Sequence, residues 1–205
     1  NVPATHVSRV ISEVLFPAYS KIQDDVAAMR SAFFETMHYV SLVSVPVAVG
    51  TIAFAAPFIN TVYGARWAPT IVPLQLLGIY GLLRSIAVNM GSVFKAGGKP
   101  NWLTYIATSR LAVMGLFLYP AIKYYGIVGV SALSAVVSIV DFFLSAALTN
   151  RIVRGRLVDY VRALWIPMTF SALSALLSMC AYRRMAAGGG FIALAMGGIL
   201  MISIY

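Results

Sequence analysis

Long hydrophobic runs broken by short polar connections make up most of the chain. A helix needs about 20 mostly apolar residues to cross the hydrocarbon core of a bilayer. Six runs reach or approach that length: residues 33–57, 70–94, 102–122, 126–149, 162–182 and 189–205, the last cut short where the chain stops. The pattern therefore predicts an all-α, polytopic bundle of about six transmembrane helices.

The composition excludes a soluble globular domain. Of the 205 residues, 60% are hydrophobic and 10% are charged, whereas soluble domains average about 45–50% and about 25%. Cys180 is the single cysteine and lies in an apolar run, so neither a disulfide nor a cysteine-based metal site is expected. Nucleotide-binding loops and metal-ligand clusters are also missing from the sequence, and we expect no cofactor and no metal.

The polar content divides the chain into three parts. Residues 1–30 mix apolar and charged positions, which predicts the end of a preceding span followed by an interfacial lead-in. Residues 31–150 hold four spans that we assign to one transport bundle, and residues 151–205 hold two further spans. Because the chain begins with Asn1 and stops inside an apolar run, we expect it to be part of a longer protein.

Lysine and arginine are unevenly distributed between alternate connections, which predicts the orientation in the membrane. One set of connections carries nine: Arg9, Lys21, Arg30, Lys95, Lys99, Arg151, Arg154, Arg156 and Arg162. The other set carries four: Arg66, Lys123, Arg183 and Arg184. Positive connections stay in the cytoplasm, so the first set is predicted to be cytoplasmic. Orientation also accounts for the net charge of +9, and nucleic acid is not an expected partner.

Three ionisable residues lie near the middle of predicted spans. Arg84 and Arg110 are each within a few residues of a span centre, and Asp141 lies slightly to the cytoplasmic side of its own. Facing lipid alone, the three would together cost roughly 8–10 kcal/mol. They are therefore expected to face one another or a hydrated interior. Pairing the one acid with either arginine leaves one positive charge, which either an acid from the rest of the longer protein or an anionic cargo would offset. We favour the cargo, because guanidinium binds phosphate with two parallel hydrogen bonds.

Helical spacing extends this cluster. At 100° per residue, one face of the second span carries Tyr80, Arg84, Gly91 and Lys95, a basic stripe from the midplane to the cytoplasmic mouth. On the fourth span, one polar face carries Asp141 with Ser134, Ser138 and Ser145, and these serines fit either helix packing or a polar pathway.

The acidic and histidine residues leave two interpretations open. Asp141 fits either a static ion pair with Arg84 or Arg110, or a carboxylate that couples transport to an ion. Glu35 and His38, three residues apart near a cytoplasmic span end, fit either an interfacial polar cluster or a proton-relay pair.

Four phrases carry a family resemblance. They are "VLFPAYSKIQDD" (14–25), "YGARWAPTIVPLQLLGIYGLLRSI" (63–86), "AGGKPN" (96–101) and "YYGIVGVSALSAVVS" (124–138). Together they resemble the Wzx-type polysaccharide flippases of the multidrug/oligosaccharidyl-lipid/polysaccharide exporter superfamily. The resemblance covers most of residues 7–150, and beyond that only the hydropathy agrees.

The resemblance implies a two-lobed transporter of about fourteen spans that rocks around a central cavity. This chain would be its C-terminal portion, in a bacterial inner membrane. The implied cargo is an oligosaccharide on a polyprenyl diphosphate, moved to the outer leaflet for lipopolysaccharide O-antigen, exopolysaccharide or capsule assembly. Basic cavity residues of the family are implicated in diphosphate binding, and Arg84 matches that role best, followed by Arg110.

Other functions predict different features. A drug or cation antiporter of the same superfamily would favour an acidic cavity, and a membrane-embedded polymerase or ligase would need a long extracytoplasmic loop with catalytic groups. A scaffold subunit would use Arg84 only for structural pairing. A flippase would have the lipid-linked oligosaccharide, membrane lipids and other polysaccharide assembly proteins as candidate partners.

Overall fold

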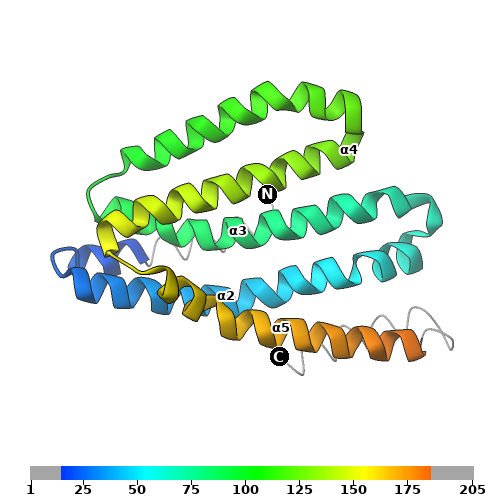
Figure 1. Ribbon diagram of the computed structural model, residues 1–205, viewed down its shortest axis with the longest axis horizontal. Coiled ribbons are helices and arrows are strands. Elements are labelled where there is room, and N and C mark those ends of the chain that lie inside the picture. The colour runs from blue at the N-terminus through cyan, green and yellow to red at the C-terminus, as the bar shows by residue number, and fades with distance from the viewer. Residues whose placement is uncertain (1–14, 186–205) are drawn as a thin grey trace.

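The computed structural model describes residues 15–185, and this part of the chain is helical with no strand in it (Figure 1). A short lead-in helix covers residues 15–21. The long helices are α2 (Val26–Phe58), α3 (Ile71–Ala96), α4 (Asn101–Val153) and α5 (Leu157–Met185). A π-helical turn at Ile59–Tyr63 and a 3-10 helix at Ala65–Thr70 connect α2 to α3.

Four helices in the described part are long and apolar enough to span a membrane. They cover Val26–Tyr63, Ala65–Ala96, Asn101–Val153 and Val158–Arg184. The described part of the chain is therefore an all-helical membrane protein, as the hydropathy predicts. The third candidate contains two of the predicted spans, 102–122 and 126–149. The predicted sixth span, residues 189–205, lies outside the described residues, as does Arg9 from the charge count.

Helix α4 is folded back on itself. Its 53 residues would extend about 80 Å if straight, far more than the roughly 30 Å of a hydrocarbon core. The backbone leaves helical geometry at Gly126, where φ is 56° and ψ is −139°, a conformation that glycine adopts readily and other residues rarely do. Figure 1 shows the two arms of α4 running antiparallel from this point.

A second glycine closes the α4 turn tightly. A Cβ atom at Gly129 would lie 2.3 Å from the Ala121 carbonyl oxygen and 2.7 Å from the Tyr125 Cβ. No side chain can occupy that space unless the backbone moves. The glycines in "YYGIVGV" (124–130) therefore turn the chain at Gly126 and let the two arms meet at Gly129.

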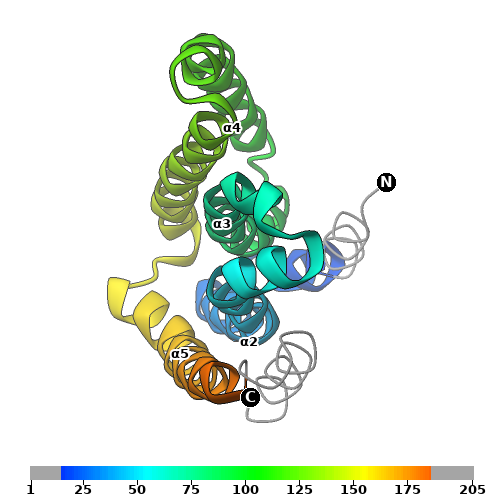
Figure 2. The same cartoon turned by 90° about the vertical axis from the view of Figure 1, so that its right-hand side faces the viewer.

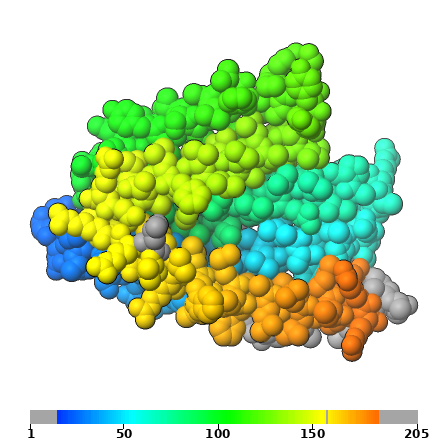
Figure 3. Space-filling view, in the orientation of Figure 1, coloured from blue at the N-terminus to red at the C-terminus, as the bar shows by residue number. Residues whose placement is uncertain are grey.

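The long helices form a curved row in the order α5, α2, α3, α4 (Figure 2). Helix α2 packs between α5 and α3, and α3 packs between α2 and α4. Figure 3 shows one broad face of the row, with α4 and α5 along its two edges. Many large apolar side chains are exposed on the outer surfaces, for example Leu111, Leu116 and Phe143. Such a surface suits contact with lipid or with further protein.

The buried core is concentrated at one end of the long helices, where α2 begins and α3 ends. Phe33 and Met37 of α2 pack there with Met90 and Phe94 of α3 and with Val153, at the end of α4. In α3, nearly all buried residues lie between Ile86 and Ala96, whereas Pro73 is the single buried position in the other half. The helices are thus held tightly at the end where α2 and α5 begin, and α3 is loosely covered towards the other end.

Polar contacts attach the lead-in helix to this packed end. The Asp25 carboxylate caps α2 by accepting hydrogen bonds from the backbone N–H groups of Ala27 at 2.9 Å and Ala28 at 3.0 Å. The buried Tyr19 hydroxyl donates to Asn89 Oδ1 of α3 at 2.9 Å. Burial raises the pKa of Tyr19, which keeps the phenol protonated and able to donate.

Candidate functional site

Two of the predicted central residues face each other across the α4 hairpin. Arg110, on the first arm, places Nη1 3.7 Å from Oδ2 of Asp141 on the second arm. Arg110 lies 16 residues before Gly126 and Asp141 lies 15 residues after it, so both are about 23 Å from the turn. The glycine turn thus sets a register that brings the two charges to the same depth. Their side chains are 29% and 12% exposed, respectively.

Arg84 supplies the second positive charge from the neighbouring helix α3. Helix α3 packs against α4, the helix that carries both Arg110 and Asp141. Arg84 itself is exposed and makes no ion pair within 4.0 Å in residues 15–185. The cluster therefore has two guanidinium groups and one carboxylate, and Arg84 is its accessible cation. Among the alternatives for Asp141, the structure contains the pair with Arg110.

The serines beside Asp141 serve their own helix. Ser131 and Ser134 donate to the carbonyl oxygens of Ile127 and Val130 four residues earlier, and Ser138 donates to Ala135 three residues earlier. These hydroxyls are satisfied within the second arm of α4, and small side chains let neighbouring helices approach closely. This geometry favours packing over a polar pathway.

The remaining residues of the predicted basic stripe lie along α3 at different exposures. Tyr80 is half-buried and Lys95 is exposed in the last turn of the helix. A lysine at that position also stabilises the negative end of the helix dipole. Gly91, between Arg84 and Lys95, is buried at the point where Leu103 of α4 packs against α3. The stripe is therefore covered near Gly91 and accessible at Arg84 and Lys95.

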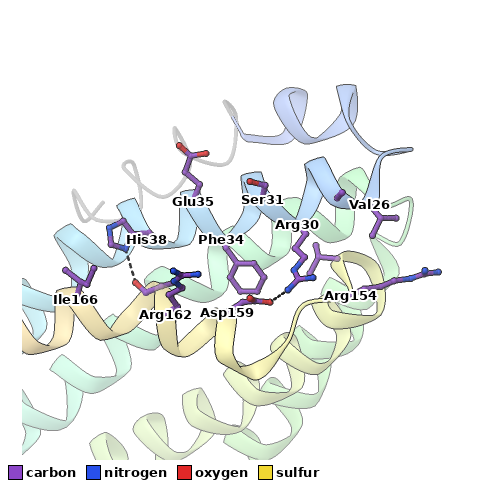
Figure 4. A pocket seen from close by; sticks show the side chains of 13 residues that line it. Val26, Arg30, Ser31, Phe34, Glu35, His38, Arg154, Asp159, Arg162 and Ile166 are labelled. Carbon is purple, nitrogen blue, oxygen red and sulfur yellow. Dashed lines mark hydrogen bonds and ion pairs between the residues drawn. The ribbon is translucent and has the colours of Figure 1, made fainter.

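Glu35 and His38 lie elsewhere, beside the groove between α2 and α5 (Figure 4). His38 Nδ1 is 3.1 Å from the Ala163 carbonyl oxygen, so this nitrogen carries the proton and donates it to α5. Glu35 is exposed on α2 and also lines this groove. The histidine is thus bonded to a neighbouring helix, and the two residues do not pair with each other in the described part of the chain.

Sequence reasoning missed two contacts between distant residues. Arg30 of α2 makes an ion pair with Asp159 of α5, whose Oδ2 also accepts the backbone N–H of Arg156 at 2.8 Å. The contact between Tyr19 and Asn89 joins residues 70 apart. One sequence signal was available, because an amide such as Asn89 inside an apolar run needs a buried partner.

The chain is similar in sequence to one protein family and to several known bacterial proteins. A family described as "Polysaccharide biosynthesis protein" matches residues 1–72. The lipopolysaccharide biosynthesis protein WzxC of Escherichia coli is 31% identical over 176 residues, which cover 83% of this chain and 35% of WzxC. The family resemblance is confirmed. An uncharacterised membrane protein in the cps region of Klebsiella pneumoniae is 31% identical over 80% of this chain and 34% of the relative.

A third relative comes from Bacillus subtilis. The teichuronic acid biosynthesis protein TuaB of Bacillus subtilis is 26% identical over 83% of this chain and 35% of its own length. The chain thus spans about a third of the length of these three relatives. No solved structure matches the chain.

Proposed function

We propose that the chain is part of a flippase, a transporter that moves a polyprenyl-diphosphate-linked oligosaccharide from the cytoplasmic to the outer leaflet. Its relatives WzxC and TuaB are named for lipopolysaccharide and teichuronic acid biosynthesis. The observation that carries the proposal is the ion pair of Arg110 and Asp141 on α4 with Arg84 on the neighbouring helix α3, which leaves one net positive charge among membrane-spanning helices.

The cluster suits a diphosphate because of how its charges are arranged. Asp141 holds Arg110 in place across the hairpin and offsets one positive charge. Arg84 remains exposed on α3 and can offer its guanidinium to a phosphate group. A cationic drug would instead need an excess of carboxylates, whereas this cluster has one carboxylate for two guanidinium groups. Arg84 is therefore assigned to cargo binding and Arg110 to its support.

The mechanism follows from the membrane setting. The diphosphate and sugars would cross beside Arg84 while the polyprenyl tail stays in lipid, and alternating access would avoid a continuous pore. The complete transporter would have two lobes, about fourteen spans in all, in a bacterial inner membrane, in keeping with relatives about two and a half times as long as this chain. Other polysaccharide assembly proteins are candidate partners of that complete transporter.

The experiment is complementation of a flippase-deficient strain by the complete protein. We expect Arg84→Gln to lower surface polysaccharide by about tenfold or more, the effect of losing one charge-assisted hydrogen bond. Arg84→Lys should retain part of the export, because it keeps the charge without the planar fork. Arg66→Gln is the matched control, since Arg66 is an exposed arginine in the connection that precedes α3.

Membrane levels decide between transport and scaffolding. For a flippase, the Arg84→Gln protein should reach the membrane at the wild-type level and unfold at the same temperature, while polysaccharide export falls. A scaffold would lose membrane level and export together. Wild-type export by Arg84→Gln at a matched level would contradict the assignment of Arg84 to the cargo.

A further inference from the structure

A groove of about 910 Å³ lies between α2 and α5 at the packed end of the molecule. It is separate from the Arg84 cluster and takes no part in the function proposed above. Its cationic lining comes from three places: Arg30 on α2, Arg154 in the connection from α4 to α5, and Arg162 on α5. Phe34, Ile166 and Val26 add an apolar lining.

The charges in the groove are only partly neutralised. Asp159 pairs with Arg30 and also accepts the Arg156 backbone N–H, so its carboxylate is occupied. Within residues 15–185, Arg162 has no carboxylate within 4.0 Å. Arg30 and Arg162 project into the space between α2 and α5 (Figure 4), and the lining also includes two carboxylates, Asp159 and Glu35. Three arginines against two carboxylates leave the groove with one net positive charge, beside an exposed serine, Ser31.

The connection before α5 holds another arginine at the rim in an unusual backbone conformation. Arg154 has φ 50° and ψ 39°, the left-handed region that glycine usually occupies at the end of a helix. A glycine does follow, but a Cβ at Gly155 would lie 2.8 Å from Cζ of Phe34, so that glycine is required for the approach to α2. A left-handed conformation costs a residue with a side chain about 1–2 kcal/mol. The left-handed position is therefore occupied by Arg154 and not by the glycine that follows it. The side chain of Arg154 extends outward along the rim of the groove (Figure 4).

The depth of the groove in the membrane restricts the class of anion that could occupy it. Apart from Val153 and Arg154, its lining residues lie between positions 26 and 38 of α2 and between 159 and 166 of α5. The hydropathy pattern starts the first and fifth spans in these segments, at residues 33 and 162. The groove thus lies at the level of lipid head groups, at the end of the molecule predicted to be cytoplasmic. Basic pockets between helices at this level suit anionic lipid head groups. A lipid can also contact the apolar side chains of the groove with its acyl chain, which a small soluble anion does not have.

We propose that the groove between α2 and α5 binds the phosphate head group of an anionic phospholipid of the cytoplasmic leaflet. Arg162 and Arg30 contact the phosphate, Arg154 attracts it from the rim, and the first part of an acyl chain lies against Ile166. The bound lipid would fill the space between the two helices and hold α5 against α2.

The test measures lipid binding to the complete protein in detergent by native mass spectrometry. The probes are phosphatidylglycerol, phosphatidylcholine with the same acyl chains, and inorganic phosphate. We expect phosphatidylglycerol to bind more tightly than phosphatidylcholine, and Arg162→Gln to weaken phosphatidylglycerol binding by about tenfold, the size of one charge-assisted hydrogen bond. Arg151→Gln is the matched control, since Arg151 is an exposed arginine at the same end and does not line the groove. It should change the affinity less than twofold.

Three results would overturn the proposal. The first is an equal change of affinity in Arg162→Gln and Arg151→Gln. The second is equal binding of the two phospholipids. The third is displacement of phosphatidylglycerol by millimolar inorganic phosphate, which would indicate a site for a soluble anion. If Arg162→Gln does not fold, Arg162→Lys replaces it: a loss of affinity greater than that of Arg151→Gln supports the proposal, and no loss refutes it.

Discussion

The α4 hairpin depends on the absence of a side chain at Gly129, and Gly129→Ala tests this directly. The new Cβ would lie 2.3 Å from the Ala121 carbonyl oxygen, whereas a relaxed contact between carbon and oxygen is about 3.3–3.6 Å. The two arms must therefore separate by about 1 Å at this level. Overpacking of this kind costs about 1–3 kcal/mol, and the atoms in the way belong to backbone that cannot rotate aside.

Equilibrium unfolding in mixed detergent micelles measures the cost. We expect Gly129→Ala to lower the free energy of unfolding by about 1–3 kcal/mol, a change of roughly 5- to 150-fold in the unfolding equilibrium. Gly115→Ala is the matched control, because Gly115 lies on the first arm of the same helix with no atom within 4 Å of an added Cβ. That control should be neutral or slightly stabilising, since alanine favours helices. Equal stability of the two variants would refute the close contact between the arms.

Three further changes test the contacts at the packed end. Asp25→Ala removes the N-cap of α2 and should lower the free energy of unfolding by about 1 kcal/mol, measured by the same unfolding assay. Tyr19→Phe leaves the buried Asn89 without its donor and should cost about 1–3 kcal/mol in that assay. A double-mutant cycle on Arg30 and Asp159 should give a coupling energy of at most about 1 kcal/mol, because both side chains are partly exposed.

Each of these predictions has its own control. Asp24→Ala alters the exposed neighbour of the capping residue and should leave stability unchanged. Tyr39→Phe removes the hydroxyl of a tyrosine that is 59% exposed, and it should also leave the free energy of unfolding unchanged. A stability loss in either control equal to that of its partner would contradict the assigned hydrogen bond. For the ion pair, a coupling energy that does not fall with added salt would contradict an exposed pair.

The sequence predicted the helices well because membrane spans are a local property. The predicted span 33–57 lies inside α2, which starts at Val26 because the Asp25 cap, not the edge of the apolar run, fixes its beginning. The polar stretch before residue 33 hid that extra length. The reversal between 122 and 126 was visible from the break in hydropathy, and Gly126 provides it.

The charge cluster was only partly accessible from the sequence. Counting residues along the spans placed Arg84, Arg110 and Asp141 at similar depths, because depth depends only on distance along each helix. The choice of Arg110 as the partner of Asp141 needed the hairpin register. The contact between Arg30 and Asp159 joins residues 129 apart, and it depends on α5 packing against α2. No pattern along the chain specifies which two helices meet in that way.

The uneven burial of α3 has a mechanical consequence. The core side chains of α3 lie between Ile86 and Ala96, so this end of the helix is fixed by packing. The other end, from Ile71 to residue 85, has little buried surface to hold it. From Ile86 to its free end at Ile71, α3 extends about 22 Å, so a swing of about 10° around Ile86 would carry that end about 4 Å. Arg84 lies two residues from Ile86 and would move less than about 1 Å in such a swing. A bundle anchored in this way could widen at its opposite mouth while its central charges keep their spacing.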